Sequence, residues 1–378
     1  MAGEDVVVLG AGRVGRAIAW DLSRDQAFSP VAVDCSPSGL AWLARRHIPT
    51  SQVDVTNPQA LLRVLGDSRW VVNALPGHLG FRILRRLVEW GKEVVDISFM
   101  PEDPRELHQL AREKGVRVAV DCGVAPGLSH LLLGAWYAQA EHLQRFVCYV
   151  GGLPRERSLP WEYKAPFSPI DVLEEYTRPA RVRRQGELVT LPPLSEPELI
   201  NIPGLGSLEA FLTDGMRTAL TSLQVPFMEE KTLRYPGFRE KLLLLQASGF
   251  LSRTPVPTSL GEVAPLEVSA KVLEEAWHLS PGEPDLTVML LKTEGTFPGN
   301  RRSRSFFLLD HYDAQSGLSS MARTTGFTAT AILRAMAKGL WREAGVLPPE
   351  LLGQSRPLVA LVLEALRERG VILQGEDL

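Results

Sequence analysis

Residues Val6–Gly15, VVVLGAGRVG, are the most informative part of the sequence about the fold. Its first four residues are apolar and predict a buried strand, and the glycines that follow have the spacing GxGxxG. Gly10 allows a tight turn, Gly12 lets the backbone approach a pyrophosphate, and Gly15 lets a helix pack closely on the strand. Arg13-Val14 then open this helix, whose N-terminal N–H groups attract a phosphate. We therefore predict a dinucleotide-binding loop.

Working outward from this loop, strand and helix patterns alternate as far as residue 123. The expected strands are 6–9, 31–33, 52–55, 70–74, 93–97 and 117–120, and the expected helices are 13–24, 40–46, 58–65, 80–90 and 103–114. The strands are apolar at consecutive positions, which is typical of a parallel sheet covered on both faces. The pattern predicts an α/β fold in which residues 1–123 form a doubly wound Rossmann domain.

The end of the second expected strand indicates the cofactor. Asp34 lies there, about 20 residues after the last glycine of the loop, where an acidic residue holds the adenosine ribose. Its negative charge would repel a 2′-phosphate, and no arginine follows it immediately. We therefore expect NAD rather than NADP.

Two further strand ends are expected at the cofactor, because ligands of open parallel sheets bind beyond the carboxyl ends of the strands. Asp54-Val55 follow the third strand and are expected near the adenine. Asn73-Ala74-Leu75-Pro76 close the fourth strand and are expected near the nicotinamide. The alternative is that both segments are only turns or helix caps.

The pattern changes after residue 123. The expected strands are now 145–150, 187–190, 232–235, 266–270, 286–291 and 305–309, and the expected helices are 128–140, 328–343 and 357–369. Spread-out strands with few helices between them predict an α+β second domain on a mixed or antiparallel sheet over residues 124–318. Residues 319–378 form C-terminal helices in this scheme.

Composition excludes several classes of protein. The 378 residues have a net charge of −3, with 45% hydrophobic and 22% charged residues, which is typical of a globular protein. Near-neutral charge without a basic block argues against nucleic acid, and no apolar run approaches the roughly 20 residues of a membrane span. The three cysteines lack metal-site spacing, and the first strand leaves no room for a signal peptide. We expect a cytoplasmic protein without a metal.

Five further motifs stand in order along the chain. They are CGVAPGL at 122–128, PGLGSLEA at 203–210, TDGMRT at 213–218, KTLRYPG at 231–237 and MARTTG at 321–326. Together they resemble the saccharopine dehydrogenase-like family over nearly the whole chain, and most of all its lysine 6-dehydrogenase branch. The resemblance implies a middle domain that forms a homodimer and closes on the substrate, with C-terminal helices that return to the Rossmann domain.

The resemblance also implies substrate contacts. Ser98 and Phe99 match positions that contact the substrate in the saccharopine reductases of the family, and Arg234 is the candidate for an arginine that binds a substrate carboxylate. Two residues depart from those reductases, which favour a 2′-phosphate where this chain has Asp34 and commonly have Asp where it has Ala125. Both departures weaken the interpretation as a saccharopine reductase, and the use of NAD with a smaller substrate fits the lysine branch better.

The chemistry of amine oxidation points to a catalytic residue. The nitrogen must be neutral before its carbon can lose hydride, so a general base is required. Asp121, after the last Rossmann strand, is our candidate, and the planar fork of Arg234 suits the substrate carboxylate. A structural cap for Asp121, and ion pairs for Arg234, Arg217 and Lys231, remain alternatives. We interpret Asp96 as buried scaffold.

These observations favour an NAD-dependent L-lysine 6-dehydrogenase of lysine degradation, which releases 2-aminoadipate 6-semialdehyde and ammonia. The first alternative is a saccharopine-type dehydrogenase that makes or cleaves a secondary amine. The second, from another class, is a non-catalytic NAD-binding sensor. The charged motifs of the second domain argue against the sensor, since a sensor would not need them.

Overall fold

The computed structural model describes residues 3–165, 169–259 and 261–375, and these divide into two compact units. The first unit comprises the chain up to Gln139 together with Ala322–Ile372. The second unit comprises Ala140–Met321 together with the strand at 373–375. The first unit is therefore built from two segments that are distant in sequence. No helix in the described part of the chain is long and apolar enough to cross a membrane.

The apolar run at the start of the chain forms the centre of a parallel sheet. The strands are β1 (Glu4–Leu9), β2 (Phe28–Asp34), β3 (Thr50–Gln52), β4 (Trp70–Asn73), β5 (Glu93–Asp96), β6 (Arg117–Ala119) and β17 (Gly345–Leu347), in the order β17-β6-β5-β4-β1-β2-β3. β1 pairs with both β2 and β4, so the strand order reverses beside the glycine loop. A doubly wound sheet binds its ligand at this position. The predicted fold class is confirmed.

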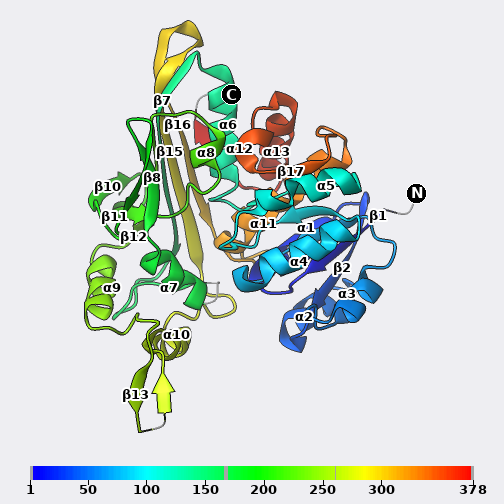
Figure 1. Ribbon diagram of the computed structural model, residues 1–378, viewed down its shortest axis with the longest axis horizontal. Helices are drawn as coiled ribbons and strands as arrows, with labels where there is room; N and C mark the ends of the chain where they lie inside the picture. Colours follow the sequence, from blue (N-terminus) through cyan, green and yellow to red (C-terminus); the bar gives the residue numbers. More distant parts are fainter. Residues whose placement is uncertain (1–2, 166–168, 260, 376–378) are drawn as a thin grey trace. The chain divides into compact units, whose positions relative to one another are not determined.

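Helices cover this sheet and share its core (Figure 1). They are α1 (Arg13–Ser23), α2 (Pro37–Ala44), α3 (Pro58–Leu65), α4 (Gly77–Glu89), the short η1 (Pro104–Leu107) and α5 (His108–Lys114). A further helix, α6 (Leu128–Gln139), packs against the C-terminal helices of the same unit. Leucines and valines of α3 and α4, with residues of η1 and α5, form one apolar cluster with the strands. Asn57 caps α3, since its side chain accepts hydrogen bonds from the N–H groups of Gln59 and Ala60.

The C-terminal helices belong to the first unit from Ala322 onward. They are α11 (Ser320–Ala337), α12 (Pro349–Leu352) and α13 (Arg356–Glu368). The buried carboxylate of Asp21 on α1 binds Arg334 Nη1 at 2.8 Å and Arg369 Nε at 2.5 Å, which ties this segment to the Rossmann helices. β17 adds to the sheet beside β6.

The first compact unit extends past residue 123, where the sequence pattern changes, as far as Gln139. Helix α6 was assigned to the second domain, yet it belongs to the first unit. A Cβ on Gly134 of α6 would lie 2.1 Å from the carbonyl oxygen of Glu350 on α12. This close helix packing depends on a residue more than 200 positions away, so the local sequence pattern did not reveal it.

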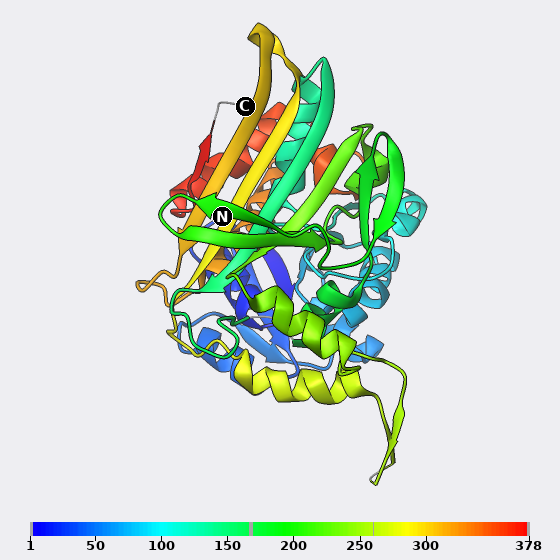
Figure 2. The same ribbon diagram turned by 90° about the vertical axis from the view of Figure 1, so that its left-hand side faces the viewer.

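The second unit has a mixed sheet (Figure 2). Its strands are β7 (His142–Pro154), β8 (Ala180–Arg184), β9 (Glu187–Leu191), β10 (Glu198–Ile202), β11 (Gly206–Thr213), β12 (Phe227–Arg234), β15 (Asp285–Phe297), β16 (Arg301–His311) and β18 (Leu373–Gly375). β12 runs parallel to β7, whereas β15 is antiparallel to it, so the prediction of a mixed sheet is confirmed. A separate hairpin joins β13 (Val256–Thr258) to β14 (Gly261–Val263).

Helices pack on the second sheet through an aromatic core. These are α7 (Pro169–Thr177), α8 (Ala219–Ser222), α9 (Phe238–Ala247) and α10 (Pro265–Ala276). Tyr176, Phe238 and Trp277 lie in the core that α7, α9 and α10 share. The strand predicted at residues 266–270 is wrong, because this segment lies within α10. Its buried positions Leu266, Ser269, Ala270 and Leu273 have helical spacing, which a five-residue window does not separate from strand alternation.

Candidate cofactor and substrate site

The three glycines of the loop have different settings. Gly10 has a φ of 95°, and a Cβ there would lie 2.5 Å from the carbonyl oxygen of Ala74. A Cβ on Gly15 would lie 1.9 Å from the carbonyl oxygen of Gly10, so the fold itself requires both glycines. Gly12 is the N-cap of α1, and a Cβ there would have no described atom within 4 Å. A pyrophosphate at the helix N-terminus would fill this open space.

Asp34 lies at the end of β2, beside the glycine loop. Its Oδ2 accepts a hydrogen bond from the N–H of Ala11 at 2.6 Å, and its Oδ1 accepts one from the N–H of Ser36 at 2.8 Å. Two backbone amides therefore fix the carboxylate in place. Each oxygen keeps a further lone pair for a ribose hydroxyl, so these residues fit the adenosine end of a dinucleotide.

Arginines gather between the start of α1 and the end of α2. Burial lowers the pKa of Arg16, and the positive charges of Arg13, Arg46 and Arg45 lower it further. The Arg46 guanidinium lies 3.5 Å from the ring centre of Trp42, and that of Arg16 lies 5.7 Å from it. Such a concentration of positive charge is typical of a site for phosphate groups. Among these arginines the glycine motif indicates only Arg13, because the convergence of the others depends on the packing of α2 against α1.

The ends of β4 and β5 bring three buried polar side chains together. Asn73 Nδ2 donates to Asp96 Oδ2 at 2.5 Å. Asp96 Oδ1 accepts from the N–H of Ser98 at 2.7 Å and from its hydroxyl at 2.6 Å. Asn73 Oδ1 is buried and has no hydrogen-bond partner in the described part of the chain. Two predicted site residues, Asn73 and Ser98, thus bind the same carboxylate.

A second carboxylate lies near Asp96. Burial raises the pKa of Asp96 to about 7, against hydrogen bonds from Ser98 and Asn73, and the negative charge of Asp121 raises it further. Asp121 follows β6, is 4% exposed and has a φ of 54°. Burial, followed by the charges of Asp121 and Asp96, also raises the pKa of the Cys122 thiol. A buried carboxyl group whose pKa lies near neutrality, such as that of Asp96, is typical of sites that transfer protons.

The other predicted cofactor residues lie in turns and beside the loop. Asp54 is exposed, and its Oδ1 accepts from the N–H and the hydroxyl of Thr56, which lowers its pKa. These are the bonds of the turn that we considered as the alternative for Asp54, and its role at the adenine stays a prediction. Val55 is buried in the core. The N–H of Ala74 donates to the carbonyl oxygen of Leu9 at 2.8 Å, which places 73–76 next to the glycine loop.

Arg234 of β12 is a buried cation among aromatic rings. Its Nε donates to the Tyr176 hydroxyl at 2.8 Å, and its Nη1 donates to the carbonyl oxygen of Leu233 at 2.8 Å. Its guanidinium lies 4.7 Å from the ring centre of Tyr163. Among the described residues it makes no ion pair with a carboxylate. Burial lowers the pKa of Arg234, but Tyr176, Tyr163 and the negative charge of Glu175 together raise it above its ordinary value. A guanidinium that is buried without a direct ion pair can accept a carboxylate.

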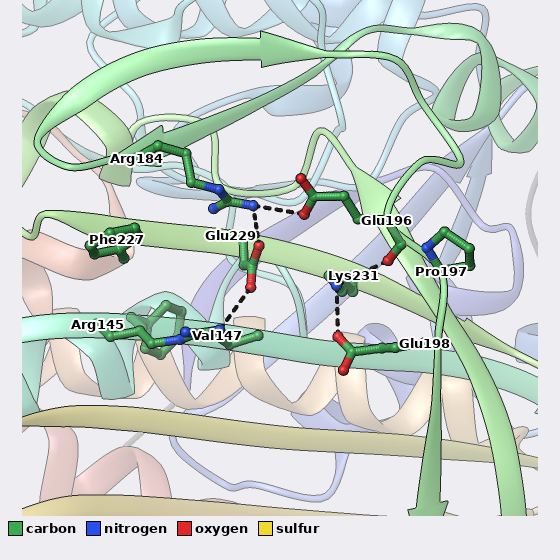
Figure 3. Close-up of a pocket in the computed structure, with 10 residues that line it drawn as sticks. Arg145, Val147, Arg184, Glu196, Pro197, Glu198, Phe227, Glu229 and Lys231 are labelled. Atoms are coloured by element: carbon green, nitrogen blue, oxygen red, sulfur yellow. Dashed lines mark hydrogen bonds and ion pairs between the residues drawn. The ribbon is translucent and has the colours of Figure 1, made fainter.

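The opposite face of β12 carries a pocket of about 430 Å³ (Figure 3). Arg184 binds Glu196 at 2.9 Å and also Glu229, and Lys231 binds Glu198 at 2.6 Å. Arg145 completes the set at 3.4 Å from Glu229. Every charged side chain of this pocket therefore has an opposite charge beside it, so the pocket offers a ligand no unsatisfied group. Lys231 has the ion pair that we considered as its alternative.

Comparisons with known proteins match the two parts of the chain to two family models. The saccharopine dehydrogenase NADP binding domain matches residues 6–119, and the saccharopine dehydrogenase C-terminal domain matches residues 123–371. The chain belongs to the saccharopine dehydrogenase family. The resemblance inferred from the ordered motifs is thereby confirmed, and this family member is an oxidoreductase that acts on C–N bonds and binds a nicotinamide dinucleotide.

Relatives of this saccharopine dehydrogenase family member match over most of its length. A saccharopine dehydrogenase [NADP(+), L-glutamate-forming] of Schizosaccharomyces pombe is 24% identical over 98% of both chains. A carboxyaminopropylagmatine dehydrogenase of Synechocystis is 22% identical over 90% of this chain and 91% of its own. The apo saccharopine dehydrogenase (L-Glu forming) of Saccharomyces cerevisiae has the same fold, with a TM-score of 0.79 over 99% of both chains at 19% identity.

The names of the relatives differ from two expectations drawn from the sequence, which are lysine as the substrate and NAD as the cofactor. These relatives are named for saccharopine and for carboxyaminopropylagmatine rather than for lysine. The first family model and the Schizosaccharomyces pombe relative are named for NADP, whereas Asp34 favours NAD. With either cofactor, the chain is a nicotinamide-dependent C–N oxidoreductase of amino-acid metabolism.

One buried acid of this saccharopine dehydrogenase family member escaped the sequence analysis. Glu230 lies on the same face of β12 as Arg234, and burial raises its pKa to about 8, with the negative charges of Glu175 and Asp214 adding to the effect. Its Oε2 has no hydrogen-bond partner among the described residues. At neutral pH Glu230 is a neutral acid that can donate a proton. Its position four residues before Arg234 on a strand is the signal that could have found it.

Proposed function

We propose that this chain oxidises an amine C–N bond in a carboxylate-bearing amino acid, with NAD as cofactor. The buried guanidinium of Arg234, which forms no ion pair with a carboxylate in the described part of the chain, is the observation that carries this proposal. The names of the relatives favour a secondary amine such as saccharopine as substrate. L-Lysine, with a primary amine, is the second candidate, and the departures at Asp34 and Ala125 favour it.

The residues of the chain have separate tasks in this mechanism. Gly12 and the N-terminus of α1 hold the pyrophosphate, and Asp34 holds the adenosine ribose. A bound nicotinamide supplies the hydride chemistry. Asp121 accepts the proton of the substrate ammonium, so that the nitrogen lone pair becomes available. Arg234 holds the substrate carboxylate in a bidentate pair.

Replacing Arg234 tests the carboxylate anchor. Arg234→Met keeps the volume of the side chain but removes its charge, and it should raise the KM for the amino acid by about 10- to 100-fold, because a charge-assisted pair contributes roughly 1.5–3 kcal/mol. Arg183→Met is the matched control, since Arg183 is a buried arginine that binds the backbone carbonyl oxygens of Leu220 and Leu223. Steady-state kinetics separate KM from kcat. An unchanged KM in folded Arg234→Met would show that Arg234 only packs against the aromatic core.

Cofactor choice tests the role of Asp34. We expect NADH to bind at least about tenfold tighter than NADPH, because placing a 2′-phosphate beside a fixed carboxylate costs about 1.4 kcal/mol or more. Asp34→Asn keeps a hydrogen-bond acceptor for Ala11 but removes the charge, and it should bring the two affinities within about threefold. Fluorescence titration of both cofactors measures this ratio. Tighter binding of NADPH to the unchanged protein would show that the arginines of α1 and α2 outweigh Asp34.

A substrate panel tests the reaction itself. Protein is mixed with NAD or NADP and single amino acids, and reduced cofactor is followed by its absorbance. Signal with saccharopine alone supports the secondary amine, and signal with lysine alone supports the lysine 6-dehydrogenase. Absence of signal from every amino acid, with cofactor bound, would contradict the enzyme and favour the sensor.

A further inference from the structure

The carboxylate of Asp96 is surrounded by donors from two strand ends. It accepts from Asn73 Nδ2 on one oxygen and from the N–H and hydroxyl of Ser98 on the other, at 2.5–2.7 Å. Asp96 is completely buried. A Cβ on Gly80 of α4 would lie 2.3 Å from Ser98 Oγ, so the helix packs directly against this arrangement. These side chains have little freedom to rearrange.

The carboxylate of Asp96 determines which atoms of Asn73 and Ser98 donate hydrogen bonds and which are left as acceptors. An ionised carboxylate only accepts hydrogen bonds, whereas an amide or a hydroxyl can do either. Asn73 must therefore turn its NH₂ group toward Asp96, which leaves its Oδ1 pointing away. The hydroxyl of Ser98 must likewise donate its hydrogen bond to Asp96, so that Oγ has only lone pairs left for another partner. Both residues thus offer acceptors to any further partner.

One of these acceptors lacks a partner. Asn73 Oδ1 is buried and unpaired in the described part of the chain, and buried polar atoms of folded proteins nearly always have a hydrogen-bond partner. Since Asn73 ends β4, next to β1 where the strand order reverses, its oxygen lies at the ligand-binding edge of the sheet.

We propose that Asp96 sets specificity at this strand end by holding Asn73 and Ser98 as acceptors, which makes the site a receptor for an N–H donor. The donor is either the carboxamide of the nicotinamide or the amine of the substrate. This inference rests on the proposed function, because it requires a nicotinamide dinucleotide at the carboxyl ends of the strands. It assigns Asp96 a positioning role where the sequence analysis expected only scaffold.

Protonation of Asp96 would release its partners. Burial, with the charge of Asp121 adding to it, raises the pKa of Asp96 to about 7, so the ionised form that holds both acceptors grows as pH rises through 7. The neighbouring Cys122 thiol stays neutral in this range, because its pKa is also raised. Preference for an N–H donor should therefore increase between pH 6 and pH 8.5.

Binding of a cofactor analogue tests the carboxamide. The reduced 3-acetylpyridine dinucleotide has a methyl ketone in place of the carboxamide and so lacks the N–H donor. At pH 8.5 we expect the unchanged protein to bind NADH at least about tenfold tighter than this analogue, as measured by fluorescence titration. In Asp96→Asn the ratio should fall below about twofold, because the new amide lets Asn73 turn around. Asp103→Asn, at the N-cap of η1, is the control and should leave the ratio unchanged.

A second set of measurements tests whether the amine of the substrate is the N–H donor. If the donor comes from the substrate, the analogue ratio is near one in the unchanged protein, and Asp96→Asn and Ser98→Ala each raise the KM of the amino acid by about tenfold. Either pattern supports the inference. If Asp96→Asn does not fold by circular dichroism, the pH dependence of the ratio and of the KM in the unchanged protein decides, and pH-independent values overturn the inference.

The outcomes separate this inference from the proposed function. If the unchanged protein binds no dinucleotide, the proposed function fails and the inference fails with it. If it binds dinucleotide but folded Asp96→Asn changes neither the analogue ratio nor the KM, only the inference is overturned.

Discussion

Gly12→Val is expected to weaken the binding of the dinucleotide by at least about 100-fold and to leave the fold intact. A side chain at this position would occupy the space at the N-terminus of α1, where the pyrophosphate meets the backbone N–H groups. The loss corresponds to about 2.7 kcal/mol or more of binding free energy. The fold should remain intact because a Cβ on Gly12 would have no described atom within 4 Å. Fluorescence titration with NADH and NADPH measures the affinity.

Gly15→Ala gives the contrasting result and serves as the control. A Cβ there would lie 1.9 Å from the carbonyl oxygen of Gly10, so this variant should lose thermal stability rather than affinity alone. Circular dichroism during heating distinguishes the two variants. If Gly12→Val kept the affinity of the unchanged protein, the loop would be only a turn and the dinucleotide site would lie elsewhere.

Asp121→Asn is expected to lower kcat by at least about 10²-fold and to leave the affinity for the dinucleotide unchanged. The general base is lost, whereas the glycine loop and Asp34 are not touched. Asparagine suits this position because it tolerates the left-handed conformation that Asp121 adopts, with a φ of 54°. A defect in kcat would then reflect chemistry rather than misfolding. Stopped-flow measurement of the first turnover, with a separate cofactor titration, measures both quantities.

Two results would contradict this assignment. A folded Asp121→Asn variant that kept most of its kcat would show that Asp121 is a strand-end cap. A variant that lost its thermal stability would show that the buried carboxylate serves the fold. The base would then have to be sought among the other acids, and Glu230, with a pKa raised to about 8, is the first alternative.

The fold of the first unit could be predicted where local pattern and burial coincide. Val6 to Leu9 are fully buried, so their apolar run was sufficient to locate β1. β17 was missed, because three residues at Gly345–Leu347 become a strand only by pairing with β6. The start of α11 was placed eight residues too late. The N–H groups of Ser320 and Met321 are capped by Asp285, which lies far from them in sequence.

The site could be predicted where one motif carries it. The glycine loop and Asp34 lie within one βαβ unit, and their arrangement follows from that unit alone. The bonds of Asp96 to Asn73 and Ser98 join two strand ends, so their convergence could not be derived from either segment. The surroundings of Arg234 depend on α7, which supplies the hydroxyl of Tyr176 and the nearby charge of Glu175.

The division of the first unit between two chain segments determines when that unit can fold during synthesis. A ribosome adds 5–20 residues per second, so on the order of ten seconds or more separates the appearance of Gln139 from that of Ala322. During this interval β6 lacks β17 as its neighbour in the sheet and is an edge strand. Asp21 likewise lacks its partners Arg334 and Arg369. An unpaired edge attracts other chains. We therefore expect β6 of the nascent chain to be open to pairing with another chain until residues 345–347 have been synthesised.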